Sequence, residues 1–216
     1  MKKCLGIILA CGWLVSACNA EPNEHAHSVY LLIDTSGTYT NELDKAQQVI
    51  NYVLFSLQPG DFFAVARIDS DSFDEKDIIA KVKLEDTRTQ ANEQKKALKR
   101  QINQYVKTIK RSKYTDITGG VVQGVQYLNE TKAGHQTLLI FSDLKEDLKK
   151  GFKRNFKFKM KNVTVVAINV TKLRSDNRDP REYLKRLAKW KNKVESSGGQ
   201  WKVINDLENL EKLFAG

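Results

Sequence analysis

The sequence has little proline, glycine or cysteine: its 216 residues include 3 Pro, 12 Gly and 3 Cys. So little Pro and Gly excludes a collagen-like or low-complexity chain, and a hydrophobic share of 41% excludes an intrinsically disordered one. A chain of this length can bury a complete hydrophobic core. We therefore predict a folded globular protein, whose formal charge of +10 needs its own explanation.

The first eighteen residues have the architecture of an export signal. Lys2 and Lys3 precede an uncharged, mostly apolar stretch, Cys4 to Val15, which is too short for the ~20 residues of a membrane-spanning helix. The sequence Val15-Ser16-Ala17-Cys18 resembles the bacterial lipobox, in which the Cys takes a lipid on its sulfur and becomes the new N-terminus. We expect a lipoprotein signal peptide over residues 1–17 and lipidation at Cys18. A signal peptide that is simply cleaved is the alternative.

Processing of this kind would leave no disulfide in the mature chain, because two cysteines leave with the signal and the third is acylated. Residues 18–27 are polar and are interpreted as a lipid-anchored tether, followed by one domain over 28–216. The expected location is the cell envelope, on a membrane through the lipid. Asn19 after the lipidated residue suits the outer membrane if the envelope is Gram-negative.

From residue 28 onward, apolar runs alternate with segments of helical periodicity. The runs expected to be buried strands are Val29–Ile33, Phe62–Ala66, Leu138–Phe141, Val163–Ile168 and Trp201–Ile204. Helical spacing is found over 42–57 and 90–110 and after residues 117, 180 and 207. One segment, 78–84, alternates with period two directly after a strand and indicates a hairpin. The pattern predicts an α/β fold with a doubly wound, mostly parallel sheet and one antiparallel edge strand.

Hydroxyl and carboxylate side chains follow three of the predicted elements at one edge of this sheet. Asp34, Ser36 and Thr38 follow the first strand, Thr115 precedes a helix, and Asp143 follows the strand that ends at Phe141. Open α/β sheets bind their ligands at the carboxyl ends of the strands, so these side chains are expected to converge there. Oxygen ligands of this kind suit hard cations, with Mg²⁺ as the first choice and Mn²⁺ or Ca²⁺ as alternatives.

This pattern resembles the von Willebrand factor A (VWA) family and its metal-ion-dependent adhesion site, Asp-x-Ser-x-Ser with a distant Thr and a distant Asp. The resemblance covers essentially the whole domain. It implies that Ser36 and Thr38 bind the metal directly, Thr115 directly or through water, and Asp34 and Asp143 mainly through water. Thr38 stands where Ser is usual, and no Gly follows Asp143.

The function that the resemblance implies is binding of a protein partner through the cation, in adhesion or envelope assembly, without catalysis. Two carboxylates nearly balance one divalent ion, so the ion could still accept an acidic ligand from the partner. The oligomeric state stays open.

Two alternatives come from other features of the sequence. Basic side chains crowd residues 88–113 and 145–161, which could bind an anionic membrane surface or polymer without a metal. Nucleic acid is disfavoured as the partner because the chain carries an export signal.

The strand ending in Asp-x-x-Gly-Thr also resembles haloacid-dehalogenase phosphatases, with Asp34 as the nucleophile. That family has a second Asp where this chain has Ser36, which cannot act as a general acid near neutral pH.

A short acidic segment lies between the second strand and the hairpin strand. Five acidic residues fall within 69–77, and the segment lacks the glycine and terminal glutamate of an EF-hand loop. It is interpreted as a solvated acidic turn near the predicted metal site.

Overall fold

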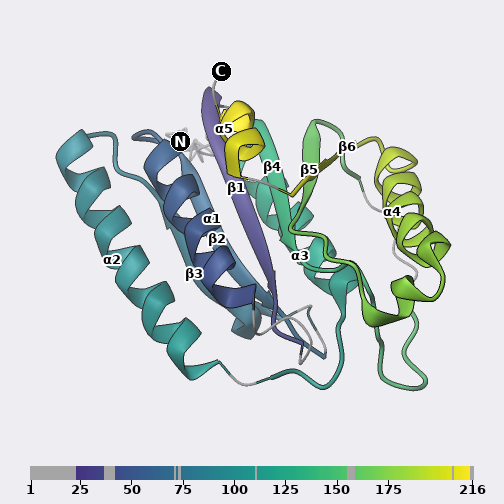
Figure 1. The fold of residues 1–216 in the computed structure, drawn as a ribbon. Coiled ribbons are helices and arrows are strands. Elements are labelled where there is room, and N and C mark those ends of the chain that lie inside the picture. Colours follow the sequence, from purple (N-terminus) through teal and green to yellow (C-terminus); the bar gives the residue numbers. More distant parts are fainter. Residues whose placement is uncertain are drawn as a thin grey trace, which may run out of the picture.

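A six-stranded sheet in the order β3-β2-β1-β4-β5-β6 runs through the computed structural model (Figure 1). The structure describes residues 23–36, 42–70, 72, 74–109, 111–154, 159–205 and 207–214. The strands are β1 (Asn23–Asp34), β2 (Phe62–Ile68), β3 (Ile78–Lys83), β4 (Ala133–Phe141), β5 (Val163–Ile168) and β6 (Gln200–Ile204). The β2–β3 pair is antiparallel and the other four pairs are parallel. The predicted fold class is confirmed, including the antiparallel edge strand.

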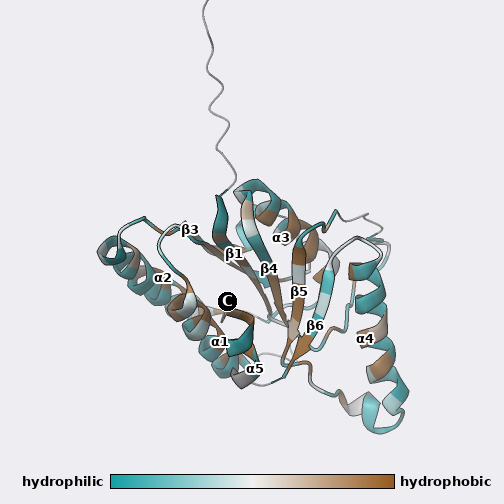
Figure 2. Ribbon diagram, turned by 90° about the horizontal axis from the view of Figure 1, so that it is seen from above, coloured by the Kyte–Doolittle hydropathy of each residue, from teal (hydrophilic) through white to brown (hydrophobic). Residues whose placement is uncertain are grey.

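Helices cover both faces of the sheet, as the alternation of strands and helices predicted. The α-helices are α1 (Leu43–Ser56), α2 (Arg88–Thr108), α3 (Ile117–Thr131), α4 (Pro180–Glu195) and α5 (Leu207–Phe214), with short 3-10 helices η2 (Glu75–Asp77) and η3 (Arg174–Asn177). The cluster of buried side chains on one face takes residues from α1, α2 and α5, and the cluster on the other face from α3 and α4. Figure 2 shows the apolar strands between these two layers.

The central strand β1 explains why the sheet must be covered twice. Val29, Leu31 and Ile33 belong to the cluster under α1 and α2, whereas Tyr30 and Leu32 belong to the cluster under α3. All five side chains are fully buried. An unbroken apolar run is therefore required here, because successive side chains point to opposite faces and neither face is solvated.

The domain starts earlier than residue 28, the boundary expected from the sequence. β1 already begins at Asn23, so the last five residues of the predicted tether, 23–27, belong to the sheet. The amide of His27 donates to Asp61 at 2.8 Å, and its ring stacks on that of His135 with centroids 4.6 Å apart. These residues are polar because they lie at the rim of the sheet, where a polar strand end is hard to distinguish from a linker.

The predicted signal peptide and Cys18 lie outside the described residues. In the part of the chain that is described, no helix combines the length and the apolar character needed to cross a membrane.

Candidate functional site

Asp34 ends β1 at the carboxyl edge of the sheet and is completely buried. Both of its carboxyl oxygens accept hydrogen bonds: Oδ1 from the Ser36 amide at 2.8 Å, and Oδ2 from the Ser142 hydroxyl at 2.6 Å. Ser142 directly follows β4, the strand beside β1 in the sheet. Asp34 is thus fixed by the two neighbouring strand ends. Thr38, the third residue of the predicted motif, lies outside the described residues.

The segment that leads into α3 passes over the ends of β1 and β2. The Ser112 amide donates to the Thr35 carbonyl, and the Asp116 amide to the Asp69 carbonyl, each at 3.0 Å. Thr115 lies between these two attachments and is almost fully buried. Backbone hydrogen bonds therefore hold Thr115 at the edge where β1 and β2 end.

Asp143 follows β4 and is also buried at this edge. Its Oδ1 accepts the Lys145 amide at 2.7 Å, and its carbonyl accepts the Arg186 Nε–H at 3.2 Å. Burial, and then the negative charge of Asp34, raises the pKa of Asp143 to about 6. Burial also raises the pKa of Asp34, although the hydrogen bonds from Ser142 and Ser36 oppose it. The charge of Asp34 thus disfavours ionisation of Asp143 at this edge.

The loop after Asp143 is fastened to the start of α3. Thr115 and Asp147 exchange two backbone hydrogen bonds, of 2.7 and 3.0 Å. Nearby, the Glu146 carboxylate accepts the Thr118 amide at 2.8 Å. The segment carrying Asp143 and the one carrying Thr115 are therefore held together directly.

A buried ion pair closes the same junction. Asp116 caps α3 by accepting the Gly119 amide at 2.8 Å, and its other oxygen pairs with the Arg154 guanidinium at 2.7 Å. Arg154 belongs to the basic stretch 145–161, which the sequence offered as an alternative binding surface for anions. That interpretation is wrong for Arg154, because its partner Asp116 is buried and 38 residues away.

The acidic segment 69–77 is also only partly the solvated turn that the sequence indicated. Arg67 is the penultimate residue of β2. It pairs with Asp69 at 2.9 Å and with the buried Asp77 at 3.0 Å. The Ser112 hydroxyl donates to Asp69 at 2.6 Å, so this acid also helps to position the segment before α3. Asp74 and Glu75 are solvated, with side chains 55% and 84% exposed.

The side chains at this edge fit a hard divalent cation by their chemistry. Asp34 and Asp143 are buried carboxyl groups, and neither carboxylate takes part in any of the ion pairs given above. A divalent ion between them would relieve the repulsion of their negative charges. Within the described ranges, no group of three or more His, Cys, Asp and Glu side chains is placed to hold a metal. A cation site at this edge would therefore depend on hydroxyl oxygens, and Ser36 and Thr115 supply the type that is needed.

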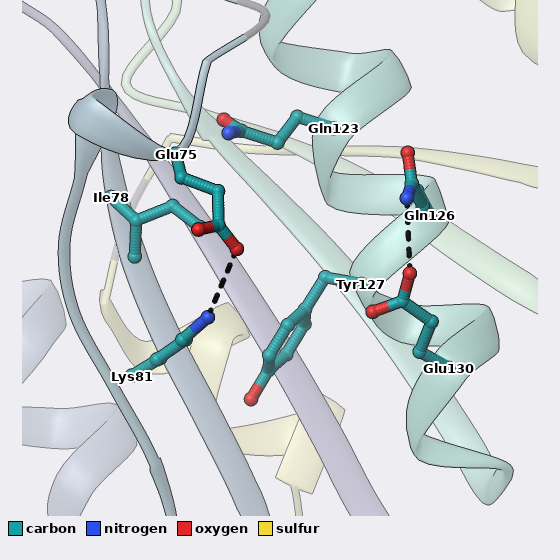
Figure 3. A pocket seen from close by; sticks show the side chains of 7 residues that line it. All are labelled: Glu75, Ile78, Lys81, Gln123, Gln126, Tyr127 and Glu130. Atoms are coloured by element: carbon teal, nitrogen blue, oxygen red, sulfur yellow. Dashed lines mark hydrogen bonds and ion pairs between the residues drawn. The ribbon is translucent and has the colours of Figure 1, made fainter.

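The chain also has a hollow that none of the candidate site residues lines, between β3 and α3 (Figure 3). It encloses about 180 Å³, and its lining consists of Glu75, Ile78, Lys81, Gln123, Gln126, Tyr127 and Glu130. Several of its polar groups pair with one another: Lys81 with Glu75 at 3.3 Å, and Gln126 with Glu130 at 3.0 Å. Such internal pairing leaves this hollow without an obvious ligand.

Three solved structures show what the fold resembles. A von Willebrand factor type A protein from Catenulispora acidiphila matches 88% of this chain and 41% of its own, with a TM-score of 0.53 and 13% identity. BatB from Bacteroides thetaiotaomicron matches 88% of this chain and 95% of its own, with a TM-score of 0.52 and 12% identity. The pilus adhesin SpaC from Lactobacillus rhamnosus GG matches 88% of this chain and 29% of its own, with a TM-score of 0.51 and 13% identity.

The chain has a von Willebrand factor A fold. It spans about two fifths of the Catenulispora acidiphila protein and less than a third of SpaC. No protein-family model matches the chain, and no curated protein matches it in sequence. At such low identity the likeness establishes the VWA fold alone, so the function of the edge has to be argued from its side chains.

Proposed function

We propose that this chain is a lipid-anchored VWA domain that binds a protein partner through a divalent cation at the carboxyl edge of its sheet. The observation that carries the proposal is the burial of Asp34 and Asp143 beside each other at this edge, close enough for Asp34 to raise the pKa of Asp143. Burying two carboxylates together is unfavourable unless a positive charge joins them.

The cation would be held by Asp34, Ser36, Thr38, Thr115 and Asp143. We propose Mg²⁺ as the bound ion, with Mn²⁺ or Ca²⁺ as alternatives. When bound, the ion would supply a Lewis-acidic point that can accept a carboxylate from a partner. Asp34 and Asp143 would offset its two charges. Ser142 and Lys145 would keep the two carboxyl groups oriented through the hydrogen bonds that they already donate.

Binding without catalysis is the proposed activity, in adhesion or in assembly of the envelope. SpaC, whose fold is similar, is a pilus adhesin. The alternative of an anion-binding surface over 145–161 is weakened, because Arg154 of this segment pairs with Asp116 inside the protein. The lipid on Cys18 would keep the domain at the envelope membrane.

A direct metal-binding measurement tests the proposal. All described elements and both buried clusters lie within residues 23–214, so a soluble form that starts at Asn19 retains every contact of the fold. Calorimetric titration with Mg²⁺, Mn²⁺ and Ca²⁺ should give saturable binding that Asp143→Asn and Thr115→Ala weaken at least tenfold. Thr115→Ser should restore it, because Ser keeps the hydroxyl.

Asp74→Asn is the matched control, since it removes an exposed carboxylate from the neighbouring acidic segment. It should leave cation binding unchanged. Equal affinity in Asp143→Asn and the unmodified protein would show that the cation, if bound, is held elsewhere.

Partner binding is tested with the same soluble form on envelope extracts. Capture of a protein in Mg²⁺ should be lost with EDTA or with Asp34→Ala. Capture that survives both treatments would refute the metal-dependent mechanism. Hydrolysis of a generic phosphate ester that is abolished by Asp34→Asn would instead support the phosphatase alternative.

A further inference from the structure

The last turn of α1 exposes a phenylalanine that belongs to neither of the two buried clusters. Phe55 is 82% exposed, whereas its neighbours Val53 and Leu54 are buried in the core. The ring borders a hollow of about 340 Å³ between α1 and α2, lined by Asn51, Leu54, Phe55, Asn92, Lys95, Lys96 and Lys99. The ring is exposed at the border of a hollow, so its apolar surface is available to a ligand.

Three lysines of α2 line the same hollow as the ring. This helix carries six basic residues and one acid, Glu93. Lys95 donates to the Leu57 carbonyl just beyond the end of α1, which holds its aliphatic stem beside the hollow. Lys96 and Lys99 are exposed, and Lys96 pairs with Glu93 in the solvent. An apolar ring with lysines around it complements an anionic surface that has an apolar layer beneath it.

The hollow lies at the amino edge of the sheet, opposite Asp34 and Asp143. Asp61 accepts the amides of both Gln58 and His27, at 2.7 and 2.8 Å, and so joins the chain just after α1 to the first half of β1. In Figure 1 this edge is at the top, with the start of β1. The five residues from Cys18 to 22 can extend by at most ~17 Å, so the lipid would be close to this edge.

We propose that Phe55, Lys95, Lys96 and Lys99 form a docking patch for an anionic lipid bilayer. The phenyl ring enters the interfacial region, Lys96 and Lys99 contact the lipid phosphates, and Lys95 packs its stem beside the ring. The choice of a bilayer over an acidic protein rests on the proposed lipid anchor, which brings a membrane to this edge. The patch turns the carboxyl edge away from the membrane, toward partners.

α4 provides a matched comparison within the same chain. It is also strongly basic, and its Leu184 is 61% exposed. However, α4 follows β5 and begins at the carboxyl edge, so Leu184 lies near the end of the molecule opposite Phe55. If charge and an apolar side chain were sufficient for membrane contact, both positions would behave alike.

Site-specific labelling separates these outcomes. The soluble form from Asn19 has no cysteine, because all three lie at positions 4, 11 and 18. Phe55→Cys and Leu184→Cys are each labelled with the polarity-sensitive fluorophore NBD and mixed with vesicles of phosphatidylcholine, with or without phosphatidylglycerol. A blue shift is expected at position 55 only, and only with the anionic lipid. Equal shifts at both positions, or none at position 55, would overturn the proposal.

Partition into anionic vesicles gives the energetic test on unlabelled protein. Phe55→Ser should lower the partition coefficient about tenfold, as expected for partial burial of a phenyl ring. Lys96→Gln and Lys99→Gln should each lower it about fivefold. The control Lys185→Gln/Lys191→Gln on α4 should leave it unchanged; an equal loss there would mean that only net charge matters.

The measurements are made in EDTA and repeated with Asp34→Ala, so they do not depend on the metal. Vesicle binding that persists in EDTA is the expected result. If the calorimetric titration of the unmodified protein shows no cation binding while vesicle binding is present, the proposed function is overturned and the patch stays intact. Binding of a soluble acidic polypeptide through Phe55, with no partition into vesicles, would overturn the patch and leave the metal site intact.

Discussion

Helix α3 packs against the sheet through glycines, and this contact sets the position of the segment that carries Thr115. An added Cβ at Gly124 would lie 2.6 Å from the Leu138 Cδ1 atom and 2.8 Å from the Tyr30 Cδ1 atom. At Gly120 the nearest atom is the Leu32 Cδ2 methyl at 3.0 Å. The same substitution, to alanine, therefore meets two different environments on one helix.

Two opposing effects decide the stability of these variants. Alanine favours a helix over glycine by about 1 kcal/mol, and this gain is common to both positions. Overpacking a tight core costs ~1–3 kcal/mol. At Gly124 the clash involves the aromatic ring of Tyr30, which is fully buried and cannot rotate away. At Gly120 the terminal methyl of Leu32 has to shift by only a few tenths of an ångström.

We therefore expect Gly124→Ala to be less stable than the unmodified protein by about 1–2 kcal/mol, and Gly120→Ala to lie within ~1 kcal/mol of it. Urea unfolding followed by circular dichroism measures both, with the midpoint changing and the slope constant. If Gly124→Ala proves as stable as Gly120→Ala, the close approach of α3 to β1 and β4 is not what requires glycine.

Two further perturbations test the ion pairs that brace the candidate site. Arg154→Met should destabilise the fold by about 3 kcal/mol in urea, since it leaves the buried Asp116 carboxylate without its cation, whereas Arg181→Met, on an exposed pair, should cost under ~0.5 kcal/mol. Arg186 lowers the pKa of Asp176 to about 2, below its unfolded value of about 3.9. The ionised form thus stabilises the fold above pH 4, and the stability difference between the unmodified protein and Asp176→Asn should shrink as the pH falls from 4 to 2.

The predictable parts of the fold are those that depend on local sequence patterns, such as the spacing of apolar residues. Buried strands appear as short apolar runs, and the predicted Val163–Ile168 run matches β5 residue for residue. Pro180 at the start of α4 and the period-two pattern of β3 were equally readable. The edge on which Asp34 and Asp143 meet then followed from the order of the elements alone.

The contacts that brace the edge were not predictable, because each joins residues that are distant in sequence and ordinary in type. Ser112 has no signature that distinguishes it from any loop serine, yet it binds Thr35 and Asp69. Arg154 stands among other cations, and nothing local marks it as the partner of Asp116. Only Ser142, which directly precedes Asp143 at a strand end, could have been proposed as a support for Asp34.

The positive charge of the chain now divides into groups with different consequences. A cation such as Arg154, mostly buried and paired with Asp116, stabilises the carboxyl edge instead of facing an external anion. Lys96 and Lys99 are exposed beside Phe55 at the other edge, to which the proposed lipid anchor would bring a membrane. The proposed tether would limit distance but not orientation, so the proposed lipid alone would leave the domain free to rotate. Contacts of Phe55 and its lysines with the bilayer would remove that freedom and hold the carboxyl edge outward. A fixed orientation of this kind would raise the effective concentration of the candidate site for a partner across the envelope.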